Sequence, residues 1–379
     1  MYIKLINEEK INVLFIYNKE DNKNEELIQV NNVINQINNL KEENIKLFTW
    51  PIERINKKKE NNEEEKEDEE IYEFEPNHLW ITKDLVCKKL LNNCSIIILA
   101  QSEISIEINS LRQIKSTLSA IASALGFYRI PTIGANIKDT EFSRKNLYPT
   151  FLRTSPPYSD DAIAMVRVLS RLEYRQIILI TIEGDQNGAE FAAAVKASRI
   201  EHKIHIQAHI SLNLLFKSFE ELTNKLIEEL TEYTANTVLL CAKKSDSERI
   251  FTAAYKFTGV GRVWLISESA SKAKNIPKGS LSIRLKQSMI SALRDGLAVA
   301  RTGIKSFKQN LNKNIDPPKG CQHSISDWTN FNGEKLFNEL KRQPIFEPWS
   351  GEQINFNERG DRKGMTYEIL NAKEFGGPL

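Results

Sequence analysis

The sequence predicts an α/β protein whose chain is divided between two doubly wound lobes, each built on a parallel sheet. Its 379 residues exceed what a single hydrophobic core usually fills. Strand-length apolar runs alternate with segments of helical periodicity along most of the chain, which is typical of parallel sheets covered by helices. The third observation is the pair Pro156 and Pro157, which excludes a helix and predicts an extended crossing between the lobes.

The first lobe is predicted to begin with a strand–helix–strand unit. Residues 11–17 read INVLFIY, a nearly continuous apolar run that indicates a buried parallel strand. Residues 26–40 carry apolar side chains at helical spacing and residues 45–52 form a second strand, so a right-handed crossover is expected. The remaining elements are predicted as a helix at 80–91, a strand at 95–100, a helix at 111–125 capped by Gly126, and strands at 130–135 and 151–154.

Past the prolines, the alternation resumes and predicts a second sheet. The expected helices span residues 161–171, 188–198, 219–230 and 247–257, and the expected strands span 176–181, 204–210, 237–241 and 263–267. A long helix at 287–309 is expected to return to the first lobe. The tail at 353–371 reads as two strands joined by a turn at Gly360 and Asp361.

Charge and hydropathy exclude two classes of protein. Lys and Arg number 52 against 50 Asp and Glu, a formal net charge of +2, which argues against a nucleic-acid-binding surface. No window approaches 18 consecutive apolar residues, so the chain is not expected to span a membrane by itself.

Residues 57–70 hold eight acidic residues between Glu60 and Glu70, which predicts a disordered, solvated insert. A calcium loop is the alternative, but no glycine turn or fixed ligand spacing accompanies the run.

Candidate catalytic and metal-binding groups are few. His202, His205 and His209 are the densest cluster, but strand positions four residues apart lie about 13 Å from each other, too far for His205 and His209 to share one metal. A solvated strand face is the simpler interpretation. Glu183 and Asp185 follow a strand without a partner acid or base. The sequence predicts no catalytic, cofactor or metal site, and an enzyme is the weakest functional hypothesis.

Three separated stretches carry a family resemblance. They read GFYRIPTIG at 126–134 followed by FLRTSPPYSDD at 151–161, IDPPKGC at 315–321, and INFNERGDRK at 354–363. Together they resemble the amino-terminal domain of ionotropic glutamate receptors, in particular that of the glycine-binding, obligatory subunit of NMDA-type receptors. The resemblance implies a bilobed clamshell of the type I periplasmic-binding-protein kind. Its first lobe would comprise residues 1–153 and 283–352, and its second lobe residues 154–282 and 353–379.

The resemblance also implies roles for individual residues. It implies a disulfide between Cys87 and Cys321, to which four buried thiols in a reducing compartment are the alternative. It places Phe127 and Tyr128 on a first-lobe surface that contacts a partner subunit or receives a small-molecule modulator. Core packing of Phe127 after Gly126 is the alternative.

Other residues of that expected surface are Ser123, Asn146 and Pro149. They depart from the residues that the family has in its modulator groove, so a modulator of the vertebrate kind is not expected. The crossing between the lobes is expected at Thr154, Ser155, Pro156 and Pro157. Asn93 begins a glycosylation sequon, but the site abuts a strand and we do not expect it to be used.

The function implied by the resemblance is non-catalytic: an extracellular, synaptic domain that acts in subunit assembly and in allosteric control of a glutamate-gated cation channel. The implied partners are other ionotropic glutamate receptor subunits, bound as a heterodimer through the first lobe. The membrane would be reached only through segments downstream of this chain. Residues 1–8 lack a signal sequence, so we expect the chain to be a piece of a longer reading frame.

The alternative hypothesis is a free-standing clamshell that binds a small molecule, such as an amino acid, in the interlobe cleft. Such sites hold an amino acid with clustered hydroxyl groups and backbone amides near the crossings. Residues 134–140 read GANIKDT, which lacks a hydroxyl pair.

Overall fold

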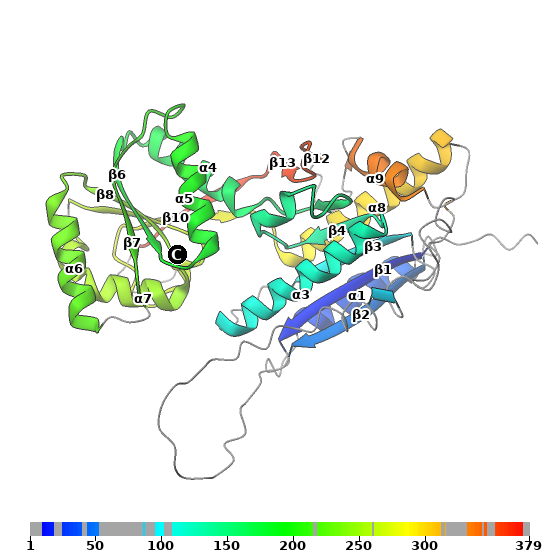
Figure 1. Cartoon of the computed structure of the whole chain (residues 1–379), viewed down its shortest axis with the longest axis horizontal. Helices are drawn as coiled ribbons and strands as arrows, with labels where there is room; N and C mark the ends of the chain where they lie inside the picture. Colours follow the sequence, from blue (N-terminus) through cyan, green and yellow to red (C-terminus); the bar gives the residue numbers. More distant parts are fainter. Residues whose placement is uncertain are drawn as a thin grey trace, which may run out of the picture. The chain divides into compact units, whose positions relative to one another are not determined.

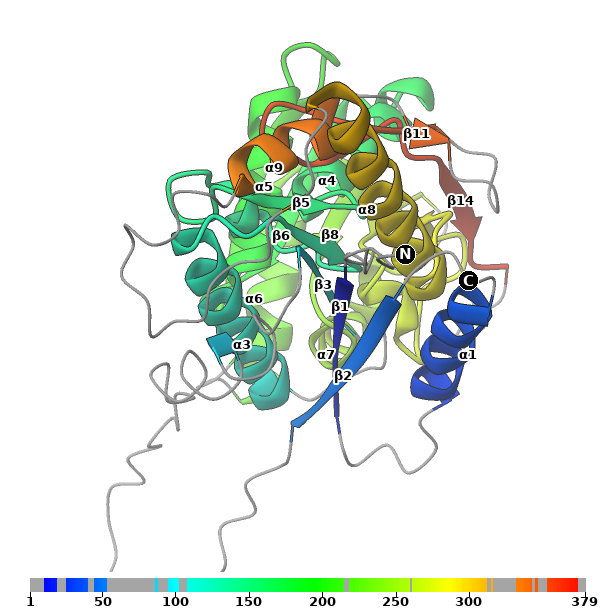
Figure 2. The same ribbon diagram turned by 90° about the vertical axis from the view of Figure 1, so that its right-hand side faces the viewer.

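The computed structural model describes residues 10–18, 25–39, 44–52, 86–87, 95–101, 108–214, 218–259, 261–311, 315, 332–342, 345–346 and 353–373. The chain forms two compact units, each of them α/β (Figures 1 and 2). The first unit is drawn from Met1–Ile137, Glu141–Ser155 and Gln287–Gly364, and the second from Lys138–Thr140, Pro156–Lys286 and Met365–Leu379. The predicted α/β class with two sheets is confirmed.

A five-stranded parallel sheet forms the centre of the first unit. Its strands are β1 (Lys10–Asn18), β2 (Asn44–Ile52), β3 (Ile96–Gln101), β4 (Thr132–Ala135) and β5 (Phe151–Arg153), in the spatial order β2-β1-β3-β4-β5. All neighbouring strands run parallel. The prediction of an opening strand–helix–strand unit is confirmed by β1, α1 (Glu25–Asn39) and β2.

Helices cover both faces of this sheet (Figure 2). Ile96 and Ile98 of β3 pack in one core with α1 and α8 (Met289–Leu311), whereas Ile97 and Leu99 pack in a second core with α3 (Ile108–Phe127). Successive strand residues point to opposite faces, so the unbroken run of isoleucines fills both cores at once.

The first unit is completed by elements late in the chain, which the sequence did not predict in full. Helix α9 (Gly333–Arg342) packs on α8, where Gly303 leaves no room for a side chain against Leu340. A small antiparallel sheet follows, made of β11 (Ile345–Phe346), β12 (Gln353–Phe356) and β13 (Arg362–Lys363).

The second unit contains a six-stranded sheet. Its strands are β6 (Gln176–Ile182), β7 (His205–Leu212), β8 (Thr237–Cys241), β9 (Val263–Ile266), β10 (Leu281–Leu285) and β14 (Tyr367–Asn371), in the order β14-β10-β9-β8-β6-β7. All pairs are parallel except β10 with β14, so an antiparallel strand forms one edge.

Helices α4 (Tyr158–Arg171) and α5 (Gln186–Ser198) lie on one side of that sheet, and α6 (Phe219–Glu232) and α7 (Lys244–Ala253) lie on the other (Figure 1). Ile177 and Leu179 face α4 and α5, while Ile178 and Ile180 face α6 and α7. These elements lie where the alternation predicted them, with ends shifted by a few residues. Helix α6 begins at the predicted residue because Ser218 and Glu221 form a reciprocal capping box.

The boundaries between the units differ from the predicted ones. Residues 283–286 belong to the second unit, because β10 pairs with β9 and β14. Residues 353–364 belong to the first unit, because β12 pairs with β11 and the β13 region binds β5. Thr154 and Ser155 also belong to the first unit.

Gly126 does not cap α3 in the predicted way. Arg129 takes the left-handed conformation (φ 57°) instead, and Ile130 N donates to Leu125 O at 3.0 Å. Gly126 lies within the last turn, where a Cβ would come 2.9 Å from Pro149 Cδ. The acidic insert at 57–70 and Asn93 lie outside the described residues, and of the predicted helix at 80–91 only Val86 and Cys87 are described.

Candidate functional site

Arg153, the last residue of β5, is the centre of a buried charged network inside the first unit. Its guanidinium Nε lies 2.6 Å from Asp361 Oδ1, and the two side chains are 0% and 5% exposed. Ser143 Oγ donates to the Asp361 carboxylate at 3.0 Å and accepts from the Arg153 guanidinium. Both charges are therefore compensated by partners as well as by each other, which a buried ion pair requires.

The turn that carries Asp361 is shaped by Gly360. Gly360 has φ 75°, and a Cβ there would lie 2.7 Å from Phe151 O. Arg153 N donates to Gly360 O at 3.0 Å, and Asp361 N donates to Asn357 Oδ1 at 2.9 Å. A side chain at position 360 would therefore separate β5 from the turn.

A second buried pair, Arg362 and Asp295, continues the network to the start of α8. These side chains are 1% and 4% exposed, and the guanidinium Nη1 contacts Asp295 Oδ2. Gln287 Nε2 donates to Asp295 Oδ2 at 2.9 Å and to Thr154 O at 3.1 Å. Ser155 Oγ donates to Gln287 Oε1 at 2.9 Å.

This network lies beside three of the points at which the chain passes between the units, which are after Ser155, before Gln287 and after Gly364. Of the predicted crossing residues, Thr154 and Ser155 bind Gln287, whereas Pro156 and Pro157 are buried in the second unit. Pro157 is extended (φ −69°, ψ 158°) immediately before α4, as the proline pair predicted. The network is thus an anchor for the crossing segments.

The last turn of α3 and the loop before β5 form an exposed surface on the first unit, which we call the α3 surface. Phe127 is 64% exposed and Leu147 is 46% exposed. Gly126 lies against both Pro149 and the carbonyl of Leu147, which brings the helix end and the loop together. The rings of Phe127 and Tyr128 meet edge to face, with centroids 5.2 Å apart.

The predicted interface residues have different environments. Ser123, Phe127 and Asn146 are exposed, and Tyr128 and Pro149 are partly buried. Core packing of Phe127, the alternative, is therefore wrong. Leu147 was not predicted, although an apolar residue in an otherwise polar loop was a usable signal. Exposed aromatic and aliphatic side chains of this kind are typical of protein interaction sites.

A polar cluster in the second unit lies near the carboxyl ends of β8 and β9. Tyr367 donates to Asp161 Oδ1 at 2.8 Å, and Lys138 Nζ lies 3.0 Å from Glu268 Oε2. Burial raises the pKa of Asp161 to about 6, against the opposing effects of Lys138 and Tyr367. Burial also raises the pKa of the nearby Cys241 thiol. The cluster therefore contains a carboxyl group, that of Asp161, whose pKa lies near 6.

His202, His205 and His209 do not gather around one point as metal ligands would. His209 Nε2 lies 2.9 Å from Thr181 Oγ1, and its Nδ1 lies 2.9 Å from Lys196 Nζ. Partial burial and the Lys196 charge lower its pKa. Glu183 is exposed beside Gly184 in the loop before α5. In the part of the chain that the structure describes, no group of three or more metal-ligating side chains is present.

Cys87 is disulfide-bonded and Cys241 is a free thiol. Cys94 and Cys321 lie outside the described residues, so the pairing of Cys87 with Cys321 stays a prediction. No helix in the described ranges has the length and apolar character needed to cross a bilayer.

Comparison with known proteins gives consistent matches. The model of the family described as "Receptor family ligand binding region" matches residues 112–316, more than half of the chain. The chain is 31% identical over 299 residues to NMDA glutamate receptor subunit 1 of Drosophila ananassae, a match that covers 76% of this chain. It is likewise 31% identical over 264 residues to the Drosophila virilis subunit and 30% identical over 299 residues to the Drosophila erecta subunit, with 68% and 76% of this chain covered.

The matched part is only 26% to 28% of the length of these relatives. The range that the family model matches includes the first of the three stretches, residues 126–134 and 151–161, and all of the second unit except its last segment. The chain belongs to the family of receptor ligand-binding regions.

Proposed function

We propose that this chain is the extracellular amino-terminal domain of an NMDA-type glutamate receptor subunit. In this role it is non-catalytic and acts in subunit assembly and in allosteric modulation of a glutamate-gated cation channel. The observation that carries the proposal is the 31% identity to NMDA receptor subunit 1 over 76% of the chain. The same similarity does not favour a free-standing small-molecule binder.

The proposed partner is another ionotropic glutamate receptor subunit, bound through the α3 surface. Phe127 offers an aromatic anchor and Leu147 an aliphatic one, while Ser123 and Asn146 supply exposed polar groups beside them. An apolar centre with a polar rim is the usual composition of a specific protein interface. A small-molecule modulator at this contact is a further proposal, for which Tyr128 and Pro149 would supply the partly buried wall.

Co-secretion tests the partner. This chain, behind an added signal peptide, is expressed with the tagged amino-terminal domain of a second NMDA-receptor subunit type, and the complex is captured. Phe127→Asp should weaken the complex by about tenfold or more, because truncation of an aromatic anchor commonly has an effect of that size. The matched control is Ile369→Asp, which changes an equally apolar side chain, 57% exposed, in the second unit.

Circular dichroism of each variant shows whether it is folded, so that loss of the complex is not confused with loss of the fold. Unchanged capture of Phe127→Asp would contradict the α3 surface as the contact. Failure of the unmodified chain to bind any receptor subunit would contradict the proposed function itself.

A further inference from the structure

Two loops of the second unit form an exposed basic surface at the amino-terminal ends of β6 and β7. One loop follows α4 and the other follows α5. We call this surface the basic end. Its members are Arg171, Leu172, Arg175, Arg199, Ile200 and Lys203, of which Arg199 is partly buried and the others are exposed, and the exposed Glu173 and Glu201 lie between them. Ile200 is 78% exposed and Leu172 is 45% exposed, so two apolar side chains stand among the cations.

The two loops share one backbone conformation at the point where each helix ends. Glu173 (φ 62°) and Lys203 (φ 56°) take the left-handed conformation, and the residue after each of them closes a bond back to the helical turn: Tyr174 N to Leu169 O at 3.0 Å and Ile204 N to Arg199 O at 2.9 Å. Arg175 Nη1 then donates to His202 O at 2.9 Å, which ties one loop to the other. The basic end is therefore a defined surface, at which binding requires little further ordering.

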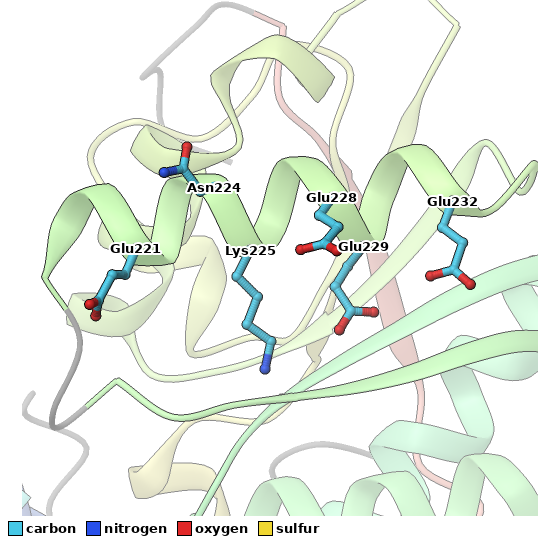
Figure 3. Close-up of a pocket in the computed structure, with 6 residues that line it drawn as sticks. All are labelled: Glu221, Asn224, Lys225, Glu228, Glu229 and Glu232. Atoms are coloured by element: carbon cyan, nitrogen blue, oxygen red, sulfur yellow. The ribbon is translucent and has the colours of Figure 1, made fainter.

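Helix α6, which covers one side of the same sheet, carries the opposite charge. Residues Glu221, Asn224, Lys225, Glu228, Glu229 and Glu232 of α6 line a shallow hollow of about 480 Å³, which we call the α6 face. The side chains of Glu221, Glu229 and Glu232 lie on the same side of the helix as Lys225 (Figure 3). Phe219, at the start of the helix, is 51% exposed.

We propose that the basic end of one copy of this chain docks on the α6 face of a second copy. The two surfaces are complementary in sign: four cations outnumber Glu173 and Glu201 at the basic end, and four glutamates outnumber Lys225 on the α6 face. Leu172 and Ile200 would meet Phe219. Complementary charge steers such an encounter and fixes its register, while the apolar side chains supply burial.

A second copy fits the basic end better than a linear polyanion does. The two glutamates would repel a sulfated or phosphorylated chain, and such a chain has no apolar groups for Ile200 and Leu172 to meet. Because the contact joins two different surfaces of the chain, it is heterologous, or head to tail. It uses no residue of the α3 surface and so stands apart from the proposed subunit contact.

The test is sedimentation velocity of the full chain over a range of concentrations. The chain carries Phe127→Asp, so that association through the α3 surface does not contribute. Association is expected in about 0.05 M NaCl and should weaken by about tenfold or more in about 0.5 M NaCl, where charges are screened over a few ångströms. A chain that stays monomeric at every concentration overturns the proposal.

Charge reversal then identifies the two surfaces. Arg171→Glu with Lys203→Glu should abolish association, and Glu228→Lys with Glu232→Lys should abolish it equally. Mixing these two variants should restore association in pairs, because the unchanged basic end of the α6 variant meets the unchanged α6 face of the basic-end variant. Lys278→Glu, at an exposed position near β10, is the control and should change nothing.

Failure of the mixture to associate overturns the proposal, as does association that survives either reversal. Heparin is the remaining probe. If heparin dissociates the oligomer of the chain, and binds the monomer only when Arg171 and Lys203 are intact, the basic end is shared and the docking model holds. If heparin binds and no oligomer forms, the basic end is a polyanion site and the proposal is wrong.

Discussion

Arg153 and Asp361 are 208 residues apart in the chain, yet their side chains form an ion pair that is almost completely excluded from water. The pair fastens the turn at Gly360 to the end of β5. Together with the pairing of β12 and β11, it holds residues 353–364 in the first unit.

Removing one member of this pair should strongly destabilise the first unit. Asp361→Ala leaves the Arg153 guanidinium buried without its main counter-charge, so we expect a loss of about 3 to 5 kcal/mol in the free energy of unfolding. Chemical denaturation monitored by circular dichroism measures it. Glu368→Ala is the control, because its pair with Arg284 is 41% and 51% exposed and should contribute about 1 kcal/mol or less. Equal losses in the two variants would contradict the interpretation.

The two glycines around the third crossing should differ in their tolerance of alanine. Both have φ 75°, so Gly364→Ala should cost about 1 kcal/mol of backbone strain. Gly360→Ala adds a Cβ that would meet Phe151 O at 2.7 Å, whereas nothing lies within 4 Å of the corresponding position at Gly364. Gly360→Ala should therefore lower the melting temperature clearly more than Gly364→Ala does.

The Asp161 carboxyl group should make the stability of the second unit depend on pH. Its pKa is raised from 3.8 to about 6, so the folded chain binds this proton more tightly than the unfolded chain. The contribution of this proton to the free energy of unfolding is full below about pH 4 and is lost as the pH rises through about 6. Melting temperatures from about pH 4 to about pH 7.5 should fall more steeply for the unmodified chain than for Asp161→Asn.

Tyr367→Phe provides the companion measurement. The phenol hydrogen bond lowers the pKa of Asp161, so its removal should move the pH-dependent window upward. An identical profile for Asp161→Asn and the unmodified chain would show that another group titrates in this range.

The predicted partner of Cys87 is Cys321. Proteolysis without reductant should yield one peptide pair that joins the two positions, identified by mass spectrometry. Cys321→Ser should destabilise the chain by about 5 kcal/mol, near the upper end of the measured range, because the loop is long and the chain-entropy term grows with loop length. Cys241→Ser is the control, because Cys241 is a free thiol and should change stability little. A Cys87–Cys94 peptide would refute the prediction.

The sequence predicted the sheets well because their signal is local. Runs such as residues 96–99, which are apolar at every position, can be satisfied only by burial on both faces. The capping pair Ser218 and Glu221 likewise marks the start of α6 within four residues of sequence. The proline pair marked the first crossing for the same reason.

The missed features depend on residues that are far apart in the chain. Asp361 and Asp295 look like ordinary surface carboxylates in the sequence, and only the fold shows that Arg153 and Arg362 neutralise them. Strand β10 was not predicted, because its pairing partner β14 lies far along the chain: Leu285 pairs with Tyr367. Gly126 was predicted to be a cap because periodicity does not reveal that Pro149 would press against the helix at that residue.

The discontinuity of the first unit has a consequence for synthesis on the ribosome. The parallel strands β6 to β10 of the second unit emerge from the ribosome as one continuous segment. Arg153 of the first unit, in contrast, can pair with Asp361 only after more than 200 further residues have been synthesised. Early-emerging β1 to β5 should therefore mature after the second unit, since contacts of such long sequence separation form slowly. Pulse proteolysis of nascent chains stalled beyond residue 300 should protect β6–β10 while β1–β5 are still cleaved; protection in the reverse order would contradict this sequence of events.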